Sequence, residues 1–245
     1  MKVLGIIPAR YASTRFPGKP LAHIGGISMI QRVYAQTQKS NVFHQVLVAT
    51  DNIEIFDHVQ SFGQACMTAD SHVSGTDRCH EVLTKQTEQY DYVINIQGDE
   101  PFIAPEQIDL LASLLDGQTE LATLVKKITD HEQLHNPNVV KAVLNKNAEA
   151  LYFSRSPVPF LRGSSTDWTT QHTYFKHIGM YAYRTDVLKK ITQLAVSALE
   201  KAESLEQLRW LENGFKIKTA ETQIETLGID TPEDLEKANS VLKAT

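Results

Sequence analysis

The residues best suited to bind a charged small molecule lie near the amino terminus, in the loop from Pro8 to Pro20. This loop carries three cations, two hydroxyl groups and a glycine: Arg10, Arg15, Lys19, Ser13, Thr14 and Gly18. Arginine contacts phosphate oxygens in pairs, lysine adds a point charge, and glycine lets the backbone approach closely. The combination suits a triphosphate, although the Walker pattern Gly-x-x-x-x-Gly-Lys-Ser/Thr is absent. The residue types alone leave an ordinary solvated loop as the alternative.

Two acidic positions are candidates for holding a divalent cation. Asp99 follows a glycine in the segment Gln97-Gly98-Asp99-Glu100-Pro101, and Asp230 lies in Gly228-Ile229-Asp230-Thr231-Pro232. Mg²⁺ takes one or two carboxylates from a protein and completes its shell with phosphate oxygens and water. For Asp230 the local sequence also fits a helix N-cap, because Asp or Thr often stands just before a helix-starting proline.

A third polar cluster, Ser74-Gly75-Thr76-Asp77-Arg78, precedes a predicted helix. Backbone amides at a helix N-terminus, together with short hydroxyls, could bind the polar edges of a nucleoside. The alternative is that Ser74 or Thr76 is a plain helix cap.

One motif suggests a metal site that we reject. His131-Glu132-Gln133-Leu134-His135 matches the H-E-x-x-H pattern of zinc proteases, which need both histidines on one face of a sustained helix and a third ligand. Here Pro137 follows within two residues, and the residue before a proline is disfavoured in a helix. The helix is therefore expected to stop directly after His135.

Three apolar segments without alternation predict strands buried on both faces, which is typical of a parallel sheet covered by helices. They are 3–7, 46–49 and 92–96, and each is followed by a polar loop and a helical pattern. This order predicts an α/β fold in which ligands bind beyond the carboxyl ends of the strands. The cationic loop and the segment around Asp99 each follow one of these strands, and the cluster that begins at Ser74 precedes a helix. Asp230 lies outside this pattern.

From about residue 120 the repeated order of strand, loop and helix ends. Segments 121–128, 139–144, 150–154 and 178–183 predict strands with antiparallel or mixed pairing, and 215–220 predicts another short strand. A helix is predicted over 205–213, closed by Gly214, and a terminal helix begins at Pro232. We expect one domain over residues 1–245, with a small lobe or dimer arm around 150–185.

The composition excludes several classes of protein. Hydrophobic residues make up 42% and charged residues 22% of 245 residues, which argues against disorder. No apolar segment approaches the length of a membrane span, and no signal peptide is recognised. The net charge of −5 and the lack of a basic block make nucleic acid an unexpected partner. With only Cys66 and Cys79, a reducing cytoplasm is the expected compartment.

Seven segments, in order along the chain, resemble the motifs of the 3-deoxy-manno-octulosonate (Kdo) cytidylyltransferases, also called CMP-Kdo synthetases. They are residues 6–20, 74–78, 95–101, 152–155, 177–181, 205–209 and 228–235, so the resemblance covers nearly the whole chain. It implies a Rossmann-like nucleotide-diphospho-sugar transferase fold: a mixed central sheet with helices on both faces and a small dimerisation lobe. It also implies a homodimer that converts CTP and Kdo to CMP-Kdo and pyrophosphate with Mg²⁺, for lipopolysaccharide synthesis.

The resemblance further implies roles for individual residues. The implied catalytic residues are Arg10, Lys19, Asp99 and Asp230, of which the two acids would bind the metal. Nucleotide contacts are expected from Pro8, Ala9, Arg10, Ser13, Lys19, Ser74, Gly75, Arg78, Gln97 and Gly98. The acidic sugar is expected to contact Arg15, Gln97, Arg155, His177, Tyr181, Glu206 and Gln207. The prolines Pro157 and Pro159 depart from the commonest family pattern and stiffen their segment.

Several alternatives stay open at this level. His177 could act as a general base, although a contact with a sugar carboxylate or hydroxyl is favoured, and Glu206 could be structural. The sugar could be 8-amino-Kdo or a sialic acid, since related enzymes share these motifs. The chain could instead be an inactive nucleotide-binding module, which the intact pair Asp99 and Asp230 argues against. The basis of cytosine selectivity is not apparent from any single side chain.

Overall fold

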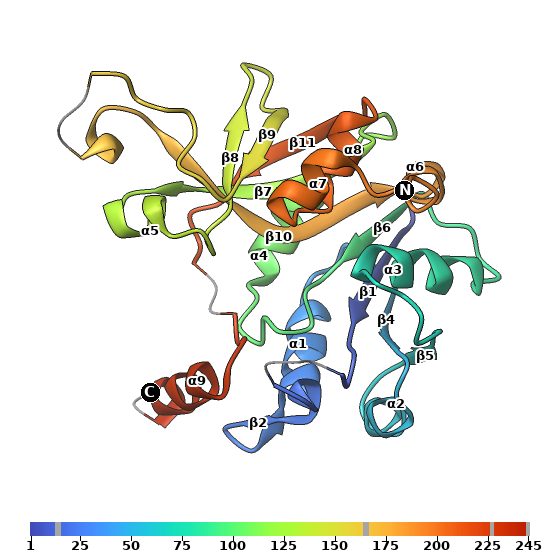
Figure 1. Ribbon diagram of the computed structural model, residues 1–245. Coiled ribbons are helices and arrows are strands. Elements are labelled where there is room, and N and C mark those ends of the chain that lie inside the picture. Colours follow the sequence, from blue (N-terminus) through green and yellow to red (C-terminus); the bar gives the residue numbers. More distant parts are fainter. Residues whose placement is uncertain (13–15, 164–166, 226–227, 244–245) are drawn as a thin grey trace. The chain divides into compact units, whose positions relative to one another are not determined.

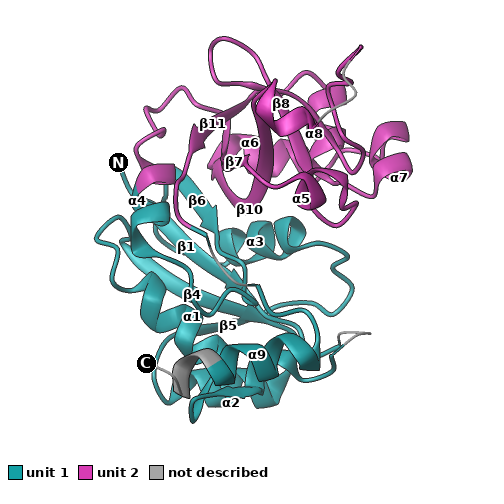
Figure 2. Ribbon diagram, turned by 90° about the vertical axis from the view of Figure 1, so that its left-hand side faces the viewer, with its two compact units in different colours: residues 1–109, 225–245 teal, residues 110–224 magenta. Residues whose placement is uncertain are grey.

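The computed structural model describes residues 1–12, 16–163, 167–225 and 228–243, with side chains up to residue 240. The chain forms two compact units (Figure 2): residues 1–109 with 225–245, and residues 110–224. The predicted lobe at 150–185 lies within the second unit, and its role in dimerisation stays a prediction.

The first unit contains a parallel four-stranded sheet in the order β6-β1-β4-β5. Its strands are β1 (Val3–Pro8), β4 (Gln45–Thr50), β5 (Ala65–Met67) and β6 (Tyr92–Asn95). Strands β1, β4 and β6 confirm the three predicted apolar segments, and their residues are buried almost throughout. The three-residue strand β5 was not predicted, because it is too short and too exposed to give a pattern.

The chain order of these strands creates a switch point. From β1 it moves outward to β4 and β5, and it then returns to β6 on the other side of β1. Because crossovers between parallel strands are right-handed, α1 and α2 cover one face of the sheet and α3 covers the other. Ligands in such sheets bind where the order reverses, here at the carboxyl ends of β1 and β6.

The helices of the first unit begin at recognisable caps. Ser28, Asn52 and Ser74 accept a backbone N–H in the first turns of α1, α2 and α3. The elements are η1 (Lys19–Leu21), α1 (Met29–Thr37), α2 (Ile53–Gln60), α3 (Gly75–Thr84) and α9 (Pro232–Lys243), with a hairpin of β2 (His23–Ile24) and β3 (Ile27–Ser28). Helix α4 (Pro105–Ala112) leads from the first unit into the second (Figure 1).

The second unit is built on a mixed sheet, as predicted. Strand β7 pairs antiparallel with β10 and parallel with β11, while β8 pairs antiparallel with β9 and β10. The strands are β7 (Leu121–Ile128), β8 (Lys141–Leu144), β9 (Ala150–Ser154), β10 (Tyr174–Arg184) and β11 (Ile217–Glu221). The register of β10 against β7 shifts between Ile178 and Tyr181, which marks a β-bulge.

Short helices complete the second unit: α5 (His131–His135), η2 (Trp168–Thr170), α6 (Thr185–Ile191), α7 (Ala198–Glu203) and α8 (Gln207–Glu212). Helix α5 ends at His135, as Pro137 predicted. Helix α8 confirms the predicted helix in a shorter form, and Gly214 follows it with a left-handed φ of 82°.

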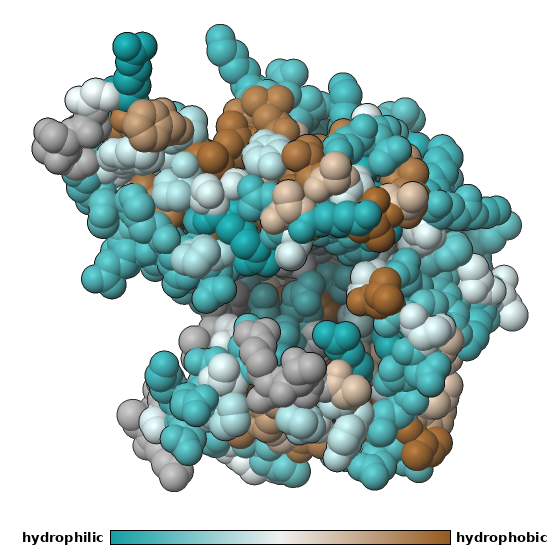
Figure 3. All heavy atoms as spheres, viewed as in Figure 1, coloured by the Kyte–Doolittle hydropathy of each residue, from teal (hydrophilic) through white to brown (hydrophobic). Residues whose placement is uncertain are grey.

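The predicted α/β class with a mixed sheet is thus confirmed. Hydrophilic residues cover most of the face shown in Figure 3, and the hydrophobic atoms on it form scattered groups. None of the helices in the described part of the chain has the length and apolar character needed to cross a membrane.

Candidate active site

The loops after β1 and β6 meet closely at the switch point. A Cβ atom added to Gly98 would lie 2.5 Å from the backbone oxygen of Pro8, so a side chain cannot be accommodated there. This contact brings the segment Gln97–Asp99 beside the start of the cationic loop. Both segments line a cavity of about 250 Å³.

Lys19 and the two candidate metal ligands come together at this cavity. The Lys19 ammonium donates to Asp99 Oδ2 at 2.8 Å, to Asp230 Oδ1 at 3.3 Å and to the carbonyl of Ile229 at 2.9 Å. Gly18 places the lysine: its φ of 69° and its N–H bond to the Tyr11 carbonyl at 3.0 Å turn the chain into η1. Acids from the middle and the end of the chain therefore both contact the Lys19 ammonium, while their binding of a metal ion stays a prediction.

Asp230 is held by its neighbours rather than used as a cap. The Ile229 N–H donates to the Asp99 carbonyl at 2.9 Å, and the Ile229 side chain is buried in a cluster with Ile24, Met29 and Ala238. The carboxylate of Asp230 contacts Lys19, and the next residue, Thr231, caps the helix.

The cap of α9 is reciprocal. Thr231 Oγ1 accepts the N–H of Asp234 at 3.2 Å, and the Asp234 carboxylate accepts the N–H of Thr231 at 3.1 Å and of Asp230 at 3.2 Å. Of the two residues that local sequence offered as a cap, Thr231 takes that role. Asp230 is consequently available to the site.

The start of helix α3 and the segment before it line one side of the cavity. Ser74 caps the helix by accepting the Asp77 N–H at 3.1 Å, so its cap role is confirmed while it also lines the cavity. Arg78 is 3% exposed, donates to Asp51 at 2.9 Å and also contacts Thr68. Its guanidinium therefore connects helix α3 to Asp51 and Thr68.

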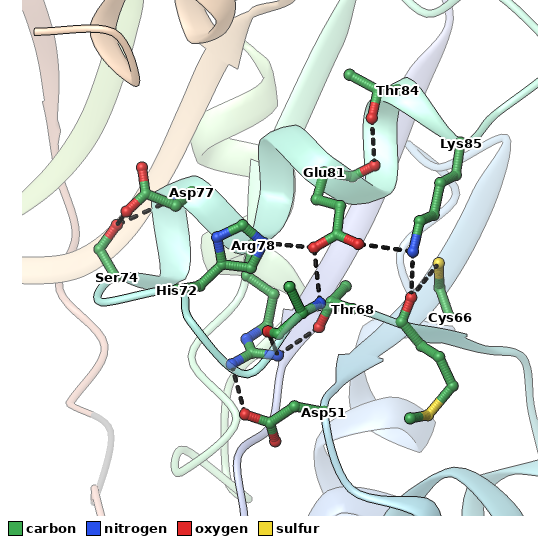
Figure 4. A network of polar contacts seen from close by, with 12 residues as sticks. Asp51, Cys66, Thr68, His72, Ser74, Asp77, Arg78, Glu81, Thr84 and Lys85 are labelled. Atoms are coloured by element: carbon green, nitrogen blue, oxygen red, sulfur yellow. Dashed lines mark hydrogen bonds and ion pairs between the residues drawn. The ribbon is translucent and has the colours of Figure 1, made fainter.

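A second network on α3 fixes the segment that leads into Ser74. The Glu81 carboxylate accepts the Ala69 N–H at 2.8 Å, pairs with Lys85 at 2.6 Å and contacts His72 Nε2 (Figure 4). Burial raises the pKa of Glu81, but the hydrogen bonds from Lys85, Ala69 and His72 outweigh it and lower the pKa to about 2. His72 lines the cavity next to this carboxylate.

The cavity is lined by every predicted nucleotide-binding residue that the structure describes. Its lining includes Pro8, Ala9, Arg10, Lys19, Ser74, Gly75, Arg78, Gln97 and Gly98, together with Asp99 and Asp230. Ser13 and Arg15 lie outside the described residues. Pro20, His72 and Val73 also line it and were missed, although His72 and Val73 directly precede the motif that begins at Ser74.

The remaining predicted sugar-binding residues lie in the second unit. His177 and Tyr181 follow each other along β10, with ring centroids 5.1 Å apart, and Tyr181 packs edge-on against Trp210 of α8. Glu206 and Gln207 lie at the start of α8. These four residues therefore gather around β10 and α8.

Arg155, whose predicted contact with the acidic sugar stays a prediction, makes hydrogen bonds with the backbone of the second unit. Its guanidinium donates to the backbone carbonyls of Glu203 at 2.7 Å, Pro137 at 3.1 Å and Ser204 at 3.3 Å. The buried Lys141 in turn donates to the Arg155 carbonyl, and desolvation lowers the pKa of this lysine. Arg155 thus anchors the turn between α7 and α8, directly before Glu206.

Burial shifts the pKa of two side chains in this unit, His177 and Tyr181. Desolvation lowers the pKa of His177 to about 3, so the imidazole is neutral at physiological pH. Burial raises the pKa of Tyr181 well above its usual value, with Tyr183 and Glu206 adding to the effect. Both side chains therefore act as uncharged groups.

Comparison with known proteins decides the family. The cytidylyltransferase family matches residues 4–219. The chain is 59% identical over 249 residues to the 3-deoxy-manno-octulosonate cytidylyltransferase of Parabacteroides distasonis, covering 99% of this chain and 98% of that protein. The protein of the same name from Cytophaga hutchinsonii is 58% identical over 238 residues, covering 96% and 95%.

The chain belongs to the 3-deoxy-manno-octulosonate cytidylyltransferase family. The fold agrees: a solved structure of CMP:2-keto-3-deoxy-manno-octonic acid synthetase complexed with CTP has a TM-score of 0.93 and 43% identity, covering 100% of this chain and 99% of that one. The resemblance inferred from seven motifs is therefore confirmed at the level of the family.

Proposed function

We propose that this cytidylyltransferase transfers CMP from CTP to the anomeric hydroxyl of Kdo and releases pyrophosphate. The observation that carries the proposal is the Lys19 ammonium held between Asp99 and Asp230 at the end of β1 and β6. It combines a phosphate-binding cation with two carboxylates at the edge of one cavity. The relatives named above support the choice of CTP and Kdo.

The nucleotide would be bound by groups of the first unit. Arg10 is exposed on the cavity, and Lys19 adds a second cation for the phosphate oxygens. The first turn of α3, at Gly75, adds backbone N–H groups and the positive end of a helix dipole. These groups together offset the negative charge that a triphosphate brings to the cavity.

The site residues fit Mg²⁺ as a cofactor. Asp99 and Asp230 both contact the Lys19 ammonium, and their carboxylate oxygens are the kind of ligand that Mg²⁺ prefers. No cluster of three or more His, Cys, Asp or Glu suited to a metal occurs among the described residues, which agrees with an ion that takes its other ligands from phosphates and water. When bound, Mg²⁺ would neutralise phosphate charge and acidify a coordinated hydroxyl.

The reaction is an in-line displacement at phosphorus. The anomeric oxygen of the sugar forms a bond to the α-phosphorus of CTP, the bond to the pyrophosphate oxygen breaks, and the proton of the sugar hydroxyl passes to water. Lys19 and Arg10 stabilise the charge that develops on the phosphate oxygens. Because charges at these positions act mainly in the transition state, removing Lys19 should reduce kcat more than it weakens sugar binding.

The sugar would be bound by residues of the second unit. His177, Tyr181, Glu206 and Gln207 offer neutral and acidic hydrogen-bonding groups, which suit hydroxyls more than a carboxylate. Arg155 would support them by fixing the α7–α8 turn. Gln97, two residues after β6, is the described residue of the first unit that we assign to the sugar.

The proposal also includes a homodimer, a cytoplasmic location and a role in lipopolysaccharide synthesis. Phe160 and Leu151, in the lobe at 150–185, are 74% and 58% exposed and are candidates for a subunit contact. Neither Cys66 nor Cys79 forms a disulfide bond, in keeping with a reducing compartment. Sedimentation of the purified protein would test the dimer.

The deciding experiment measures pyrophosphate release from CTP with Kdo, 8-amino-Kdo or a sialic acid, with and without Mg²⁺. Fastest turnover with Kdo, dependent on Mg²⁺, is expected. Faster turnover with another sugar would reassign the substrate, and CTP binding without turnover of any sugar would identify an inactive nucleotide-binding protein. A parallel series with all four nucleoside triphosphates tests the preference for cytosine.

A further inference from the structure

Thr123, a fully buried residue of β7, occupies the bulge of β10 beside His177. Its hydroxyl oxygen lies 2.8 Å from the Met180 carbonyl, 3.1 Å from the Ile178 carbonyl and 3.0 Å from His177 Nε2. The bulge turns both carbonyls toward the same hydroxyl group. Thr123 is therefore tied to the backbone of β10 as well as to the imidazole.

The protons of this cluster can be assigned by elimination. A threonine hydroxyl has one proton, and a carbonyl oxygen can only accept. If the hydroxyl donated to His177, its oxygen would face the carbonyls of Ile178 and Met180 with no proton between them. The hydroxyl must donate to a carbonyl, so it accepts a hydrogen bond from His177. His177 Nε2 consequently carries a hydrogen.

The second ring nitrogen is then left with a lone pair. Among the described residues, no hydrogen bond is made by Nδ1 of His177, and the half-buried ring is held by edge-on packing against Phe153 and by contact with Tyr181. The lowered pKa of His177 keeps the ring neutral. Nδ1 is therefore a fixed hydrogen-bond acceptor.

We propose that Thr123 is a positioning residue that locks His177 in the Nε2–H tautomer, so that Nδ1 accepts a hydrogen bond from a hydroxyl group of the sugar. The sugar part of this inference rests on the proposed function. It separates the two contacts that the sequence left open, because a lone pair attracts a hydroxyl proton and repels a carboxylate. It also argues against His177 as the general base, since a nitrogen of such low basicity holds a proton poorly.

The tautomer is tested directly by ¹⁵N NMR of histidine-labelled, ligand-free protein near neutral pH. A nitrogen that carries hydrogen and one that carries a lone pair have well-separated shifts. The signals of His177 among the nine histidines are assigned by their loss in His177→Gln. We expect hydrogen on Nε2 and a lone pair on Nδ1. Hydrogen on Nδ1, in either a neutral or a charged ring, would overturn the assignment.

Variants test the role of Thr123. Thr123→Val removes the acceptor, and we expect a mixture of tautomers and a roughly tenfold increase in KM for Kdo, the effect of one hydrogen bond, with KM for CTP unchanged. Thr123→Ser keeps the hydroxyl and should restore both the tautomer and the KM. A changed tautomer with an unchanged KM for Kdo would overturn the sugar contact.

The two proposals can fail separately. Because the NMR measurement uses no substrate, a protein that does not turn over Kdo can still show the Nε2–H tautomer. If Thr123→Val does not fold, the wild-type tautomer and the response of Nδ1 to added Kdo decide the matter. A Kdo-induced change in the Nδ1 shift with Nε2 still protonated supports the contact, and no change at saturating Kdo overturns it.

Discussion

At the scale of single residues, the contact of the Lys19 ammonium with two carboxylates explains how the site is assembled without a ligand. Asp99 and Asp230 would repel each other, and Lys19 offsets that repulsion by contacting both. The Ile229 carbonyl accepts a third hydrogen bond, so each of the three N–H groups of the ammonium has an acceptor. Lys19 therefore holds the two acids together before a substrate binds.

Replacing Asp99 by Asn keeps the shape of the side chain and removes its charge. We expect kcat to fall by at least about 100-fold, as for other groups that stabilise charge in a transition state, while the thermal midpoint stays close to that of the wild type. Asp57→Asn, on the exposed face of α2, is the matched control and should turn over normally. Near-normal pyrophosphate release by Asp99→Asn would remove the carboxylate from the mechanism.

The sequence was informative about some residues and not about others. Lys19, Asp99 and Asp230 could be predicted, because each belongs to a recognisable motif after a strand or before a proline-started helix. Thr123 could not be predicted, because its contact with His177 depends on the register of β7 against β10 and on a bulge. Likewise, the pairing of Glu81 with His72 depends on how the loop before α3 folds back.

At the scale of secondary-structure elements, α9 delivers Asp230 to a site built mainly from the first hundred residues. Its cap sets the direction in which the chain enters the helix, and Ile229 fixes the segment before it in the core. The sequence predicted the start of this helix correctly but left open which residue caps it. The hydrogen bond from the Asp234 N–H to Thr231 Oγ1 identifies Thr231 as the cap, and Asp230 instead contacts Lys19.

Thr231→Ala tests this arrangement. Loss of the cap should lower the free energy of unfolding by about 1 kcal/mol and, by loosening Asp230, reduce kcat/KM for CTP. Thr231→Ser retains the hydroxyl and should behave like the wild type. Urea unfolding and steady-state kinetics measure the two effects, and normal kinetics with reduced stability would show that Asp230 does not depend on the cap.

The Glu81 network of α3 makes stability depend on pH. Since the folded-state pKa of Glu81 is about 2, below its usual 4.5, its stabilising effect is present above pH 4.5 and is lost as pH falls toward 2. Glu81→Gln should lower stability near neutral pH by on the order of 2 kcal/mol and flatten the loss of stability on acidification.

Urea unfolding at about pH 7 and about pH 3 measures this difference. Glu54→Gln, an exposed acid on α2, serves as the control and should retain the wild-type dependence on pH. An equal loss of stability for wild type and Glu81→Gln between the two conditions would show that Glu81 is not the group responsible.

At the scale of the whole molecule, the chain divides its predicted functions between two units. The described nucleotide and metal residues lie in the first unit, and all but one of the described sugar residues lie in the second. Three of the four parallel strands of the first unit, β1, β4 and β6, were predictable from continuous apolar segments. The division itself was not, because the first unit is completed by residues 225–245 from the far end of the chain.

Tyr181→Phe tests this division of function. The Tyr181 hydroxyl is buried and has no hydrogen bond of normal geometry among the described residues, although it lies beside Thr123, so its removal should change the thermal midpoint little. The ring contacts with His177 and Trp210 remain. We expect KM for Kdo to rise about tenfold if the hydroxyl contacts the sugar.

CTP binding provides the independent measurement. A ligand at about 100 times its Kd stabilises a protein by about 2.7 kcal/mol, and Tyr181→Phe should retain the full CTP-induced rise in thermal midpoint. Tyr90→Phe loses a 2.7 Å hydrogen bond to Gln45 in the first unit and should be less stable with an unchanged KM for Kdo. If Tyr181→Phe instead lost the stabilisation by CTP, nucleotide binding would depend on the second unit, and the assignment of one substrate to each unit would be wrong.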